Sequence, residues 1–128
     1  MPRRYLKNPT ILVDPGMRRI RIYKCVLHAL GNPTHILLII DPYKRAIKIR
    51  RSEQSDPRAY HLARTLHDNN RSPEIFSKSL LRSLYMMNER WDKNQSYRIN
   101  GKASADGSEV TFNFEDYTLF LGEQEWQS

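Results

Sequence analysis

Basic side chains are the residues of this chain whose number and spacing could do chemistry. Residues 1–51 contain twelve Lys or Arg against two acidic residues, a net charge of +10, whereas residues 52–128 contain nine basic and twelve acidic residues, a net charge of −3. A guanidinium group can bind a phosphate through two parallel hydrogen bonds, and clustered cations attract a polyanion. We therefore expect one basic face that binds nucleic acid, with a merely solubilising positive surface as the alternative.

The candidate nucleic-acid-binding residues come from separate stretches of the basic half. Their guanidinium and ammonium groups could contact phosphates and guanine edges if the fold gathers them on one surface. If about six of them neutralise phosphates, the logarithm of affinity should fall with the logarithm of salt concentration with a slope of about −5. The candidates are Arg3, Arg4, Lys7, Arg18, Arg19, Arg21, Lys24, Lys48, Arg50 and Arg51.

Motifs for catalysis or metal binding are not found in the sequence. It contains no Gly-rich phosphate loop, no G-x-S-x-G elbow and no H-E-x-x-H motif. Asp14 and Asp41, the acids of the basic half, each precede a proline, which is typical of turns. Cys25 and His28 are the one close pair of possible zinc ligands, and a zinc site needs more. We expect a protein that is not an enzyme and uses no metal or cofactor.

Hydrophobic periodicity predicts the elements that position the basic residues of the first half. Apolar and charged residues alternate through Arg19-Ile20-Arg21-Ile22, which indicates a half-buried strand with its arginines outward. The period then changes to that of a helix, and Gly31 supplies the stop. The predicted elements are strands at 10–13 and 19–23, a helix at 24–30, and a hairpin of strands at 36–40 and 46–51, with Ile47 and Ile49 inward and Lys48 and Arg50 outward.

The second half repeats this order of elements. Residues 75–84 align with residues 21–30 at a constant offset of 54, so that Lys78 matches Lys24 and three apolar helix positions coincide. Ser77 is a good helix N-cap, and Leu80, Leu84 and Met87 predict one apolar stripe. Further strands are predicted at 60–63, 96–99 and 110–114, the last two joined by a turn at Asp106-Gly107. Convergent use of a common pattern is the alternative to a true repeat.

The predicted fold class is mainly β with two short helices, a β-rich α+β protein. We expect one domain over residues 1–128, built from two strand-strand-helix-hairpin repeats that form a pseudo-dimer. Repeat one covers about 8–51, a connector covers 52–58, repeat two covers about 59–116, and a mildly acidic tail that contains Trp126 covers 117–128.

Residues 19–31 resemble the core of the AbrB/SpoVT/MazE-type swapped-hairpin DNA-binding proteins, and the resemblance extends over about residues 10–51. Tyr23 stands where this family usually has proline, and Met17-Arg18 stands where a glycine-containing turn is common. The resemblance implies a swapped-hairpin barrel and DNA binding as a transcriptional regulator, with Arg18, Arg19, Arg21 and Lys24 at the matching positions. Two chains interlock in that family, and here two units of one chain would form the barrel. The matching family positions are Ile22, Lys24, Val26, Ala29, Leu30 and Gly31.

Composition also bears on compartment and partners. Cys25 is the single cysteine and the longest apolar run is Ile36–Ile40, so we expect no internal disulfide and no membrane segment, and a cytoplasmic protein of a prokaryote or phage. Double-stranded DNA is the first expected partner, bound by a monomeric pseudo-dimer or a homodimer. A non-enzymatic protein-binding module, such as an antitoxin-like or phage-encoded inhibitor, is the alternative. RNA is a third, through Tyr5, Tyr43 and Tyr60.

Overall fold

The computed structural model describes residues 8–53, 55–62 and 72–121. Strands dominate this part of the chain, and each helix lies between two pairs of strands. In chain order the elements are β1 (Thr10–Asp14), β2 (Arg19–Ile22), α1 (Lys24–Ala29), β3 (His35–Asp41), β4 (Ala46–Arg51), β5 (Tyr60–His61), β6 (Glu74–Phe76), α3 (Lys78–Met87), β7 (Ser96–Ala103) and β8 (Glu109–Phe120). The prediction of a mainly β chain with two short helices is confirmed.

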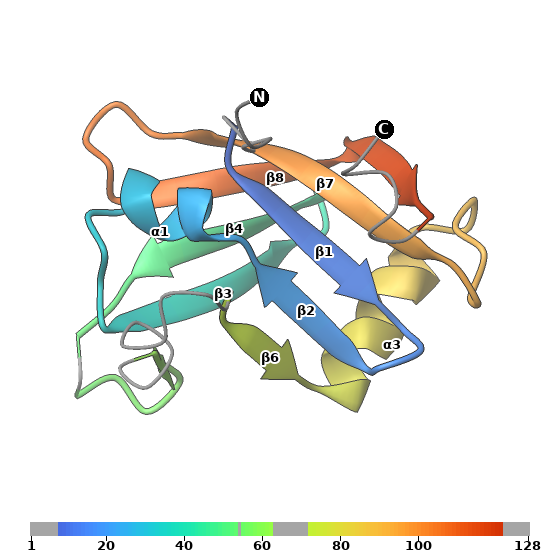
Figure 1. The fold of residues 1–128 in the computed structure, drawn as a ribbon, viewed down its shortest axis with the longest axis horizontal. Coiled ribbons are helices and arrows are strands. Elements are labelled where there is room, and N and C mark those ends of the chain that lie inside the picture. Colours follow the sequence, from blue (N-terminus) through green and yellow to red (C-terminus); the bar gives the residue numbers. More distant parts are fainter. Residues whose placement is uncertain (1–7, 54, 63–71, 122–128) are drawn as a thin grey trace, which may run out of the picture.

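All eight strands belong to one antiparallel sheet with the order β5-β3-β4-β8-β7-β1-β2-β6. The sheet curls into a half-barrel (Figure 1). Short strands form both of its margins, two residues in β5 and three in β6, and the long strands β7 and β8 lie inside it.

One hydrophobic core joins the two halves of the chain. The inward residues of β2 and β4, such as Ile20 and Ile47, share it with Phe112 of β8 and with apolar residues of both helices. Leu27 of α1 and Leu84 of α3 are among these core residues. Both helices are short, so their own backbone hydrogen bonds stabilise them little. Burial of their apolar side chains against the sheet contributes more to their stability.

Helix α1 ends as its sequence predicts. Gly31 has a φ of +78°, the left-handed conformation that glycine adopts without a steric penalty. Its N–H donates to the carbonyl of His28 at 3.1 Å, and the N–H of Asn32 donates to the carbonyl of Leu27 at 2.7 Å. These two bonds form a Schellman motif, which turns the chain out of α1 and into β3.

The β3–β4 hairpin also agrees with the prediction. Ile47 and Ile49 are fully buried, whereas Lys48 and Arg50 lie on the other face of β4. The turn is closed by Asp41, whose carboxylate accepts the N–H groups of Tyr43 and Lys44, both at 3.1 Å. Asp41 therefore has the predicted turn role.

The second half departs from the prediction at its strands more than at its helix. Ser77 caps α3 as predicted, because its hydroxyl accepts the N–H of Leu80 at 3.2 Å. The strand predicted at 60–63 is shorter, with two residues in β5, and residue 63 and the loop predicted at 68–70 lie outside the described residues. By contrast β7 and β8 are longer than predicted, and residues 117–120, expected in the tail, pair with 96–99 of β7. That end of β8 escaped prediction because its side chains do not alternate cleanly between buried and exposed.

The two halves share the order strand, strand, helix, strand, strand, but not every pairing. β1 pairs with β2, whereas β5 pairs with β3 and β6 pairs with β2. The offset of 54 holds for the helices, where Leu30 and Leu84 are both buried. It fails in side-chain orientation at the strands, because Ile22 is fully buried and its counterpart Phe76 is 63% exposed.

Neither helix of the described part of the chain has the length and apolar character needed to span a bilayer.

Gly101 lies at the irregularity of the β7–β8 pairing, and there is no room for a side chain there. A Cβ at this position would lie 2.6 Å from Cδ2 of Phe112 and 2.9 Å from Cγ1 of Val110. We expect Gly101→Ala to lower the free energy of unfolding by about 1–3 kcal/mol, because the buried ring must move. Urea denaturation followed by circular dichroism measures this. Gly16→Ala is the control, since its Cβ would meet nothing closer than 3.6 Å; equal stability of both variants contradicts the prediction.

The β7–β8 turn predicts a pH effect at Asp106. The hydroxyl groups of Ser104 and Ser108 each donate to its Oδ1 at 2.7 Å, and these bonds lower the pKa of the carboxyl to about 2. The turn therefore gains stability above the ordinary pKa of an aspartate and loses it as the pH falls through about 2. Carboxyl titration by NMR should show the pKa rising in Ser104→Ala, because the strongest of these donors is lost. A Ser104→Ala pKa equal to that of the wild type is the contrary result.

Candidate functional site

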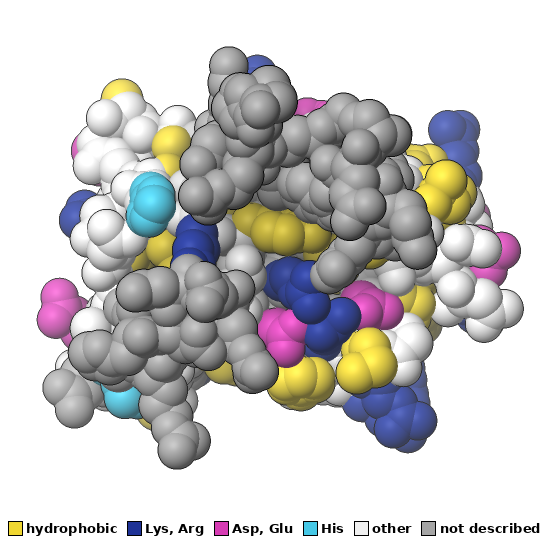
Figure 2. Space-filling view, viewed as in Figure 1, with side chains coloured by type: hydrophobic (Ala, Val, Ile, Leu, Met, Phe, Trp, Pro, Cys, Tyr) yellow, Lys and Arg dark blue, Asp and Glu magenta, His cyan; other side chains and the backbone are white. Residues whose placement is uncertain are grey.

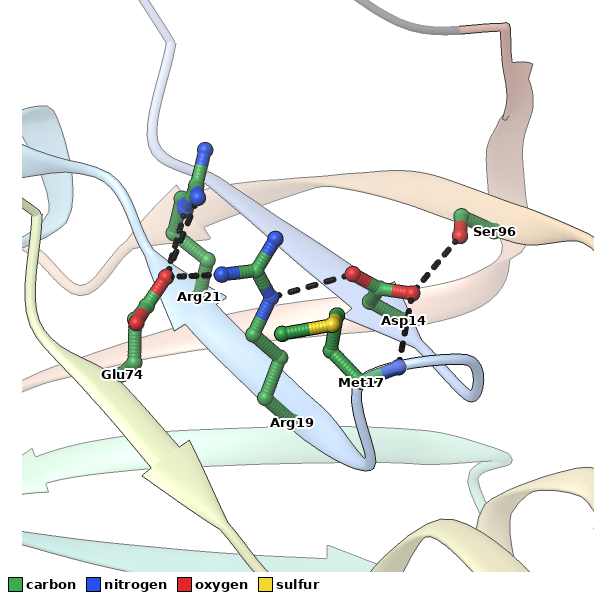
Figure 3. Close-up of polar contacts among 6 residues, drawn as sticks. All are labelled: Asp14, Met17, Arg19, Arg21, Glu74 and Ser96. Carbon is green, nitrogen blue, oxygen red and sulfur yellow. Dashed lines mark hydrogen bonds and ion pairs between the residues drawn. The ribbon is translucent and has the colours of Figure 1, made fainter.

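Two of the predicted arginines, Arg19 and Arg21, form ion pairs across the outer face of β2. Nε of Arg19 lies 3.0 Å from Oδ2 of Asp14, and Nη2 of Arg21 lies 3.0 Å from Oε2 of Glu74. A second nitrogen of Arg19 contacts the same oxygen of Glu74. Figure 3 shows both guanidinium groups turned toward this carboxylate, with the Met17 side chain beside the Asp14–Arg19 contact.

Strand register brings these charges together. Asp14 is the Cα partner of Arg19 in the β1–β2 pair, and Glu74 is the partner of Arg21 in the β2–β6 pair. Asp14 also accepts hydrogen bonds from the hydroxyl of Ser96 at 3.2 Å and from a backbone N–H of the β1–β2 turn. We call Asp14, Arg19, Arg21 and Glu74 the β2 charge network. Its two cations and two carboxylates cancel, and Figure 2 shows basic and acidic side chains side by side on this face.

Two more predicted residues, on β4, share one carboxylate. Lys48 and Arg50 both lie near Glu109 of β8, with nitrogen–oxygen distances of 3.8 Å and 3.2 Å. Positive charge that already faces a carboxylate attracts phosphate less than free charge does, because the two fields cancel at a distance.

The remaining candidates lie on separate elements. Arg18 lies in the β1–β2 turn, Lys24 begins α1, and Arg51 ends β4 with its Nη1 3.8 Å from where a Cβ of Gly31 would lie. Arg3, Arg4 and Lys7 lie outside the described residues. A single basic face built from the first half stays a prediction.

A basic cleft lies where the β1–β2 turn meets α3. It has a volume of about 320 Å³. Its cations come from three segments: Arg18 from the turn, Lys78 and Arg82 from α3, and Lys93 from the loop after α3. Its lining residues are Pro15, Arg18, Lys78, Leu81, Arg82, Tyr85, Met86 and Lys93, and none of them is acidic.

Local geometry fixes the cations of the basic cleft relative to one another. Lys78 and Arg82 are four residues apart, so they lie one above the other on the same face of α3. Arg18 has a φ of +53°, and its carbonyl accepts the N–H of Ser77, the N-cap of α3, at 3.2 Å. Within the described part of the chain, none of the four cations forms an ion pair. The lining of the cleft therefore carries four positive charges that no ion pair among the described residues offsets.

The wall of the basic cleft is apolar. Leu81 is buried, Tyr85 is half-buried and Met86 is 73% exposed. The hydroxyl of Tyr85 donates to the carbonyl of Gln95 at 2.6 Å, and burial raises its pKa well above the ordinary value. The ring is therefore a neutral, fixed part of the wall at physiological pH.

A second cleft, of about 440 Å³, has no comparable excess of charge. Arg45 and Arg90 line it together with Glu89 and Glu115. Arg45 is also held in place, because its guanidinium donates to the carbonyl of Met87 at 3.0 Å and lies 3.5 Å from Glu115. Arg45 of this cleft is thus engaged in contacts within the protein, and we assign no anion site to the cleft.

Cys25 and His28 belong to no group of metal-ligating side chains within the described residues. No group of three or more His, Cys, Asp or Glu able to hold a metal exists among residues 8–53, 55–62 and 72–121. Burial raises the pKa of the Cys25 thiol, and its Sγ donates to the carbonyl of Asn8 at 3.2 Å. The thiol is therefore protonated at neutral pH and is a poor nucleophile.

Three cations of the basic cleft were not among the sequence candidates. Lys78, Arg82 and Lys93 belong to the half whose net charge is negative, and that total hides a local group of cations. The spacing of Lys78 and Arg82 on a predicted helix was the available signal. Arg18, in the β1–β2 turn, precedes Lys78 by 60 residues. No sequence pattern predicts that these two segments meet.

The β2 charge network predicts energetic coupling between Arg21 and Glu74. In a double-mutant cycle with Arg21→Gln and Glu74→Gln, we expect a coupling energy of about 1 kcal/mol, since both side chains are partly buried. Urea denaturation of the four proteins measures it. In the Arg58–Asp56 pair the guanidinium side chain is 78% exposed, so the same cycle should show a weaker coupling there. Additive effects of Arg21→Gln and Glu74→Gln contradict the prediction.

Comparisons with known proteins give no relative for this chain, since no family model, curated protein or solved structure matches it.

Proposed function

We propose that the chain is a DNA-binding protein, a transcriptional regulator that holds duplex DNA through the basic cleft. The observation that carries the proposal is the gathering of four cations in a cleft whose lining contains no carboxylate, while Arg19, Arg21 and Arg50 of the sheet each face one. Arg18 and Arg82 supply guanidinium forks for phosphate oxygens, and Lys78 and Lys93 supply point charges. The rim of the cleft, rather than its interior, meets the DNA backbone, because a duplex is too wide to enter it.

Other basic residues extend this surface in the proposal. Lys24 and Arg51, together with Arg3, Arg4 and Lys7, remain candidate phosphate contacts. Arg19, Arg21, Lys48 and Arg50 remain candidates as well, but their carboxylate partners favour a mainly structural role.

We also propose that the fold is a duplicated swapped-hairpin barrel related to the AbrB/SpoVT/MazE type. The strand order supports this. Exchanging β1 with β5, β2 with β6, β3 with β7 and β4 with β8 reproduces the same circular order of strands, read in the opposite direction. The hairpin of each half also pairs with the first strand of the other half: β7 pairs with β1, and β3 pairs with β5. The missing β5–β6 pair and the exposed Phe76 are departures from exact two-fold symmetry.

Salt dependence of DNA binding tests the proposed function. If the four cations each neutralise one phosphate, they should contribute about −3.6 to the slope of log affinity against log salt. Arg18→Ala/Lys78→Ala/Arg82→Ala should make the slope shallower by about 2.7 and weaken binding at low salt by at least about tenfold. Fluorescence anisotropy with a labelled duplex at several salt concentrations measures both quantities.

The matched control is Lys44→Ala/Arg90→Ala/Lys102→Ala, which removes three exposed cations that do not line the basic cleft. It should keep the wild-type slope. Equal weakening by the two triple variants would assign binding to net charge alone, and no binding by the wild type at low salt would remove the proposal.

An acidic protein partner is the second candidate function. The apolar wall of the basic cleft, with Met86 largely exposed, favours it, since phosphates do not bury apolar side chains. Capture of one host protein after nuclease treatment, lost in the cleft triple variant and kept in the control variant, would support this candidate over DNA.

A further inference from the structure

Two exposed apolar side chains are close in sequence to cations of the basic cleft. Phe76 is 63% exposed and Met17 is 57% exposed. Met17 directly precedes Arg18, and Phe76 comes two residues before Lys78. Figure 2 shows hydrophobic side chains next to the charged ones on the face that carries β2 and β6. A large exposed ring two residues before a cleft cation indicates contact with a partner that offers both apolar faces and negative charge.

Phe76 has a fixed position at this surface. It is the Cα partner of Arg19 in the β2–β6 pair, and the next residue, Ser77, donates its N–H to the carbonyl of Arg18 at 3.2 Å. Among the strands that the structure describes, β6 is the last of the sheet, and none of them lies on its outer side. Phe76 is therefore the last residue of a strand at the margin of the sheet, directly before the N-cap of α3, and Figure 1 shows β6 at this margin leading into α3.

Comparison with the first half shows that this exposure is particular to Phe76. Its counterpart at the offset of 54, Ile22, is fully buried in the core. The core next to β6 is filled instead by Ile75. Phe76 thus contributes little to packing of the hydrophobic core, and its aromatic ring is accessible to a binding partner.

We propose that Phe76 inserts between base pairs of the bound DNA and that Arg18 and Lys78 hold the phosphates on either side. This inference rests on the proposed function and names its substrate more closely: duplex DNA with an opened base step. Apolar side chains that enter a base step unstack it and kink the duplex, and neighbouring cations hold the bent backbone. Bases offer the ring the apolar faces that phosphates do not.

A duplex that is already opened tests the inference. A single unpaired base in the centre of a duplex lowers the free energy needed to unstack the neighbouring base step. The wild type should therefore bind this duplex about tenfold more tightly than the continuous duplex of the same sequence. Phe76→Ala should lose that preference while keeping the salt slope on continuous DNA, because the cations remain. Phe76→Tyr should retain the preference, since it keeps the ring. Fluorescence anisotropy competition between the two duplexes measures these ratios.

Tyr43→Ala is the matched control, because Tyr43 is an aromatic residue 97% exposed in the β3–β4 turn and not a lining residue of the basic cleft. It should behave as the wild type. Thermal unfolding should give Phe76→Ala the wild-type midpoint, which separates lost insertion from lost folding. Equal wild-type affinity for both duplexes, or a preference that survives Phe76→Ala, overturns the inference and leaves the proposed function standing. Absence of wild-type binding to either duplex overturns the proposed function and the inference together.

Discussion

Glu74 is the constraint on which the architecture of the candidate site depends. Its carboxylate contacts the guanidinium groups of Arg19 and Arg21 and so ties the short strand β6 to β2. β6 has only three residues and therefore few backbone hydrogen bonds of its own. It nevertheless leads directly into α3, whose cations line the basic cleft. The position of α3 against the β1–β2 turn thus depends on ionic contacts of partly buried groups as well as on the core.

Charge in this molecule is divided between structural and uncompensated cations. On β2 and β4, arginine and lysine face carboxylates across adjacent strands, an arrangement that stabilises a sheet and contributes little field outside it. At the turn and on α3 the cations lie on segments that bring no acid with them. A net charge of +7 therefore does not act evenly over the surface. The local balance of charge decides where a polyanion would bind.

Much of the fold follows from local sequence signals. The stop of α1 at Gly31, the cap of α3 at Ser77 and the inward isoleucines of β4 were all predictable, because each depends on residues close together in the chain. The length of β8 was not predictable, since its pairing with β7 overrides a weak local pattern.

The candidate site was only partly predictable from the sequence. Arg18 was identified by its charge, but the pairing of Arg21 with Glu74 and the approach of α3 to the β1–β2 turn are long-range contacts. The twofold similarity of the halves predicted the helix positions of Leu30 and Leu84. The same similarity gives the wrong side-chain orientation at β6, where Phe76 is exposed although its counterpart Ile22 is buried.

The narrow margins of the sheet have a consequence for how the protein behaves at high concentration. An unpaired strand can template association with a second sheet, and the hazard grows with the length of the free strand. Here the margins are only two and three residues long, and the twelve-residue strand β8 pairs with neighbours on both sides over part of its length. At the β6 margin a foreign strand would find few free backbone groups, because β6 pairs with β2 at three of the four residues of β2. At the other margin β5 pairs only with His35 and Ile36 of β3, so within the described part of the chain residues 37–41 of β3 are where a second strand could add to the sheet.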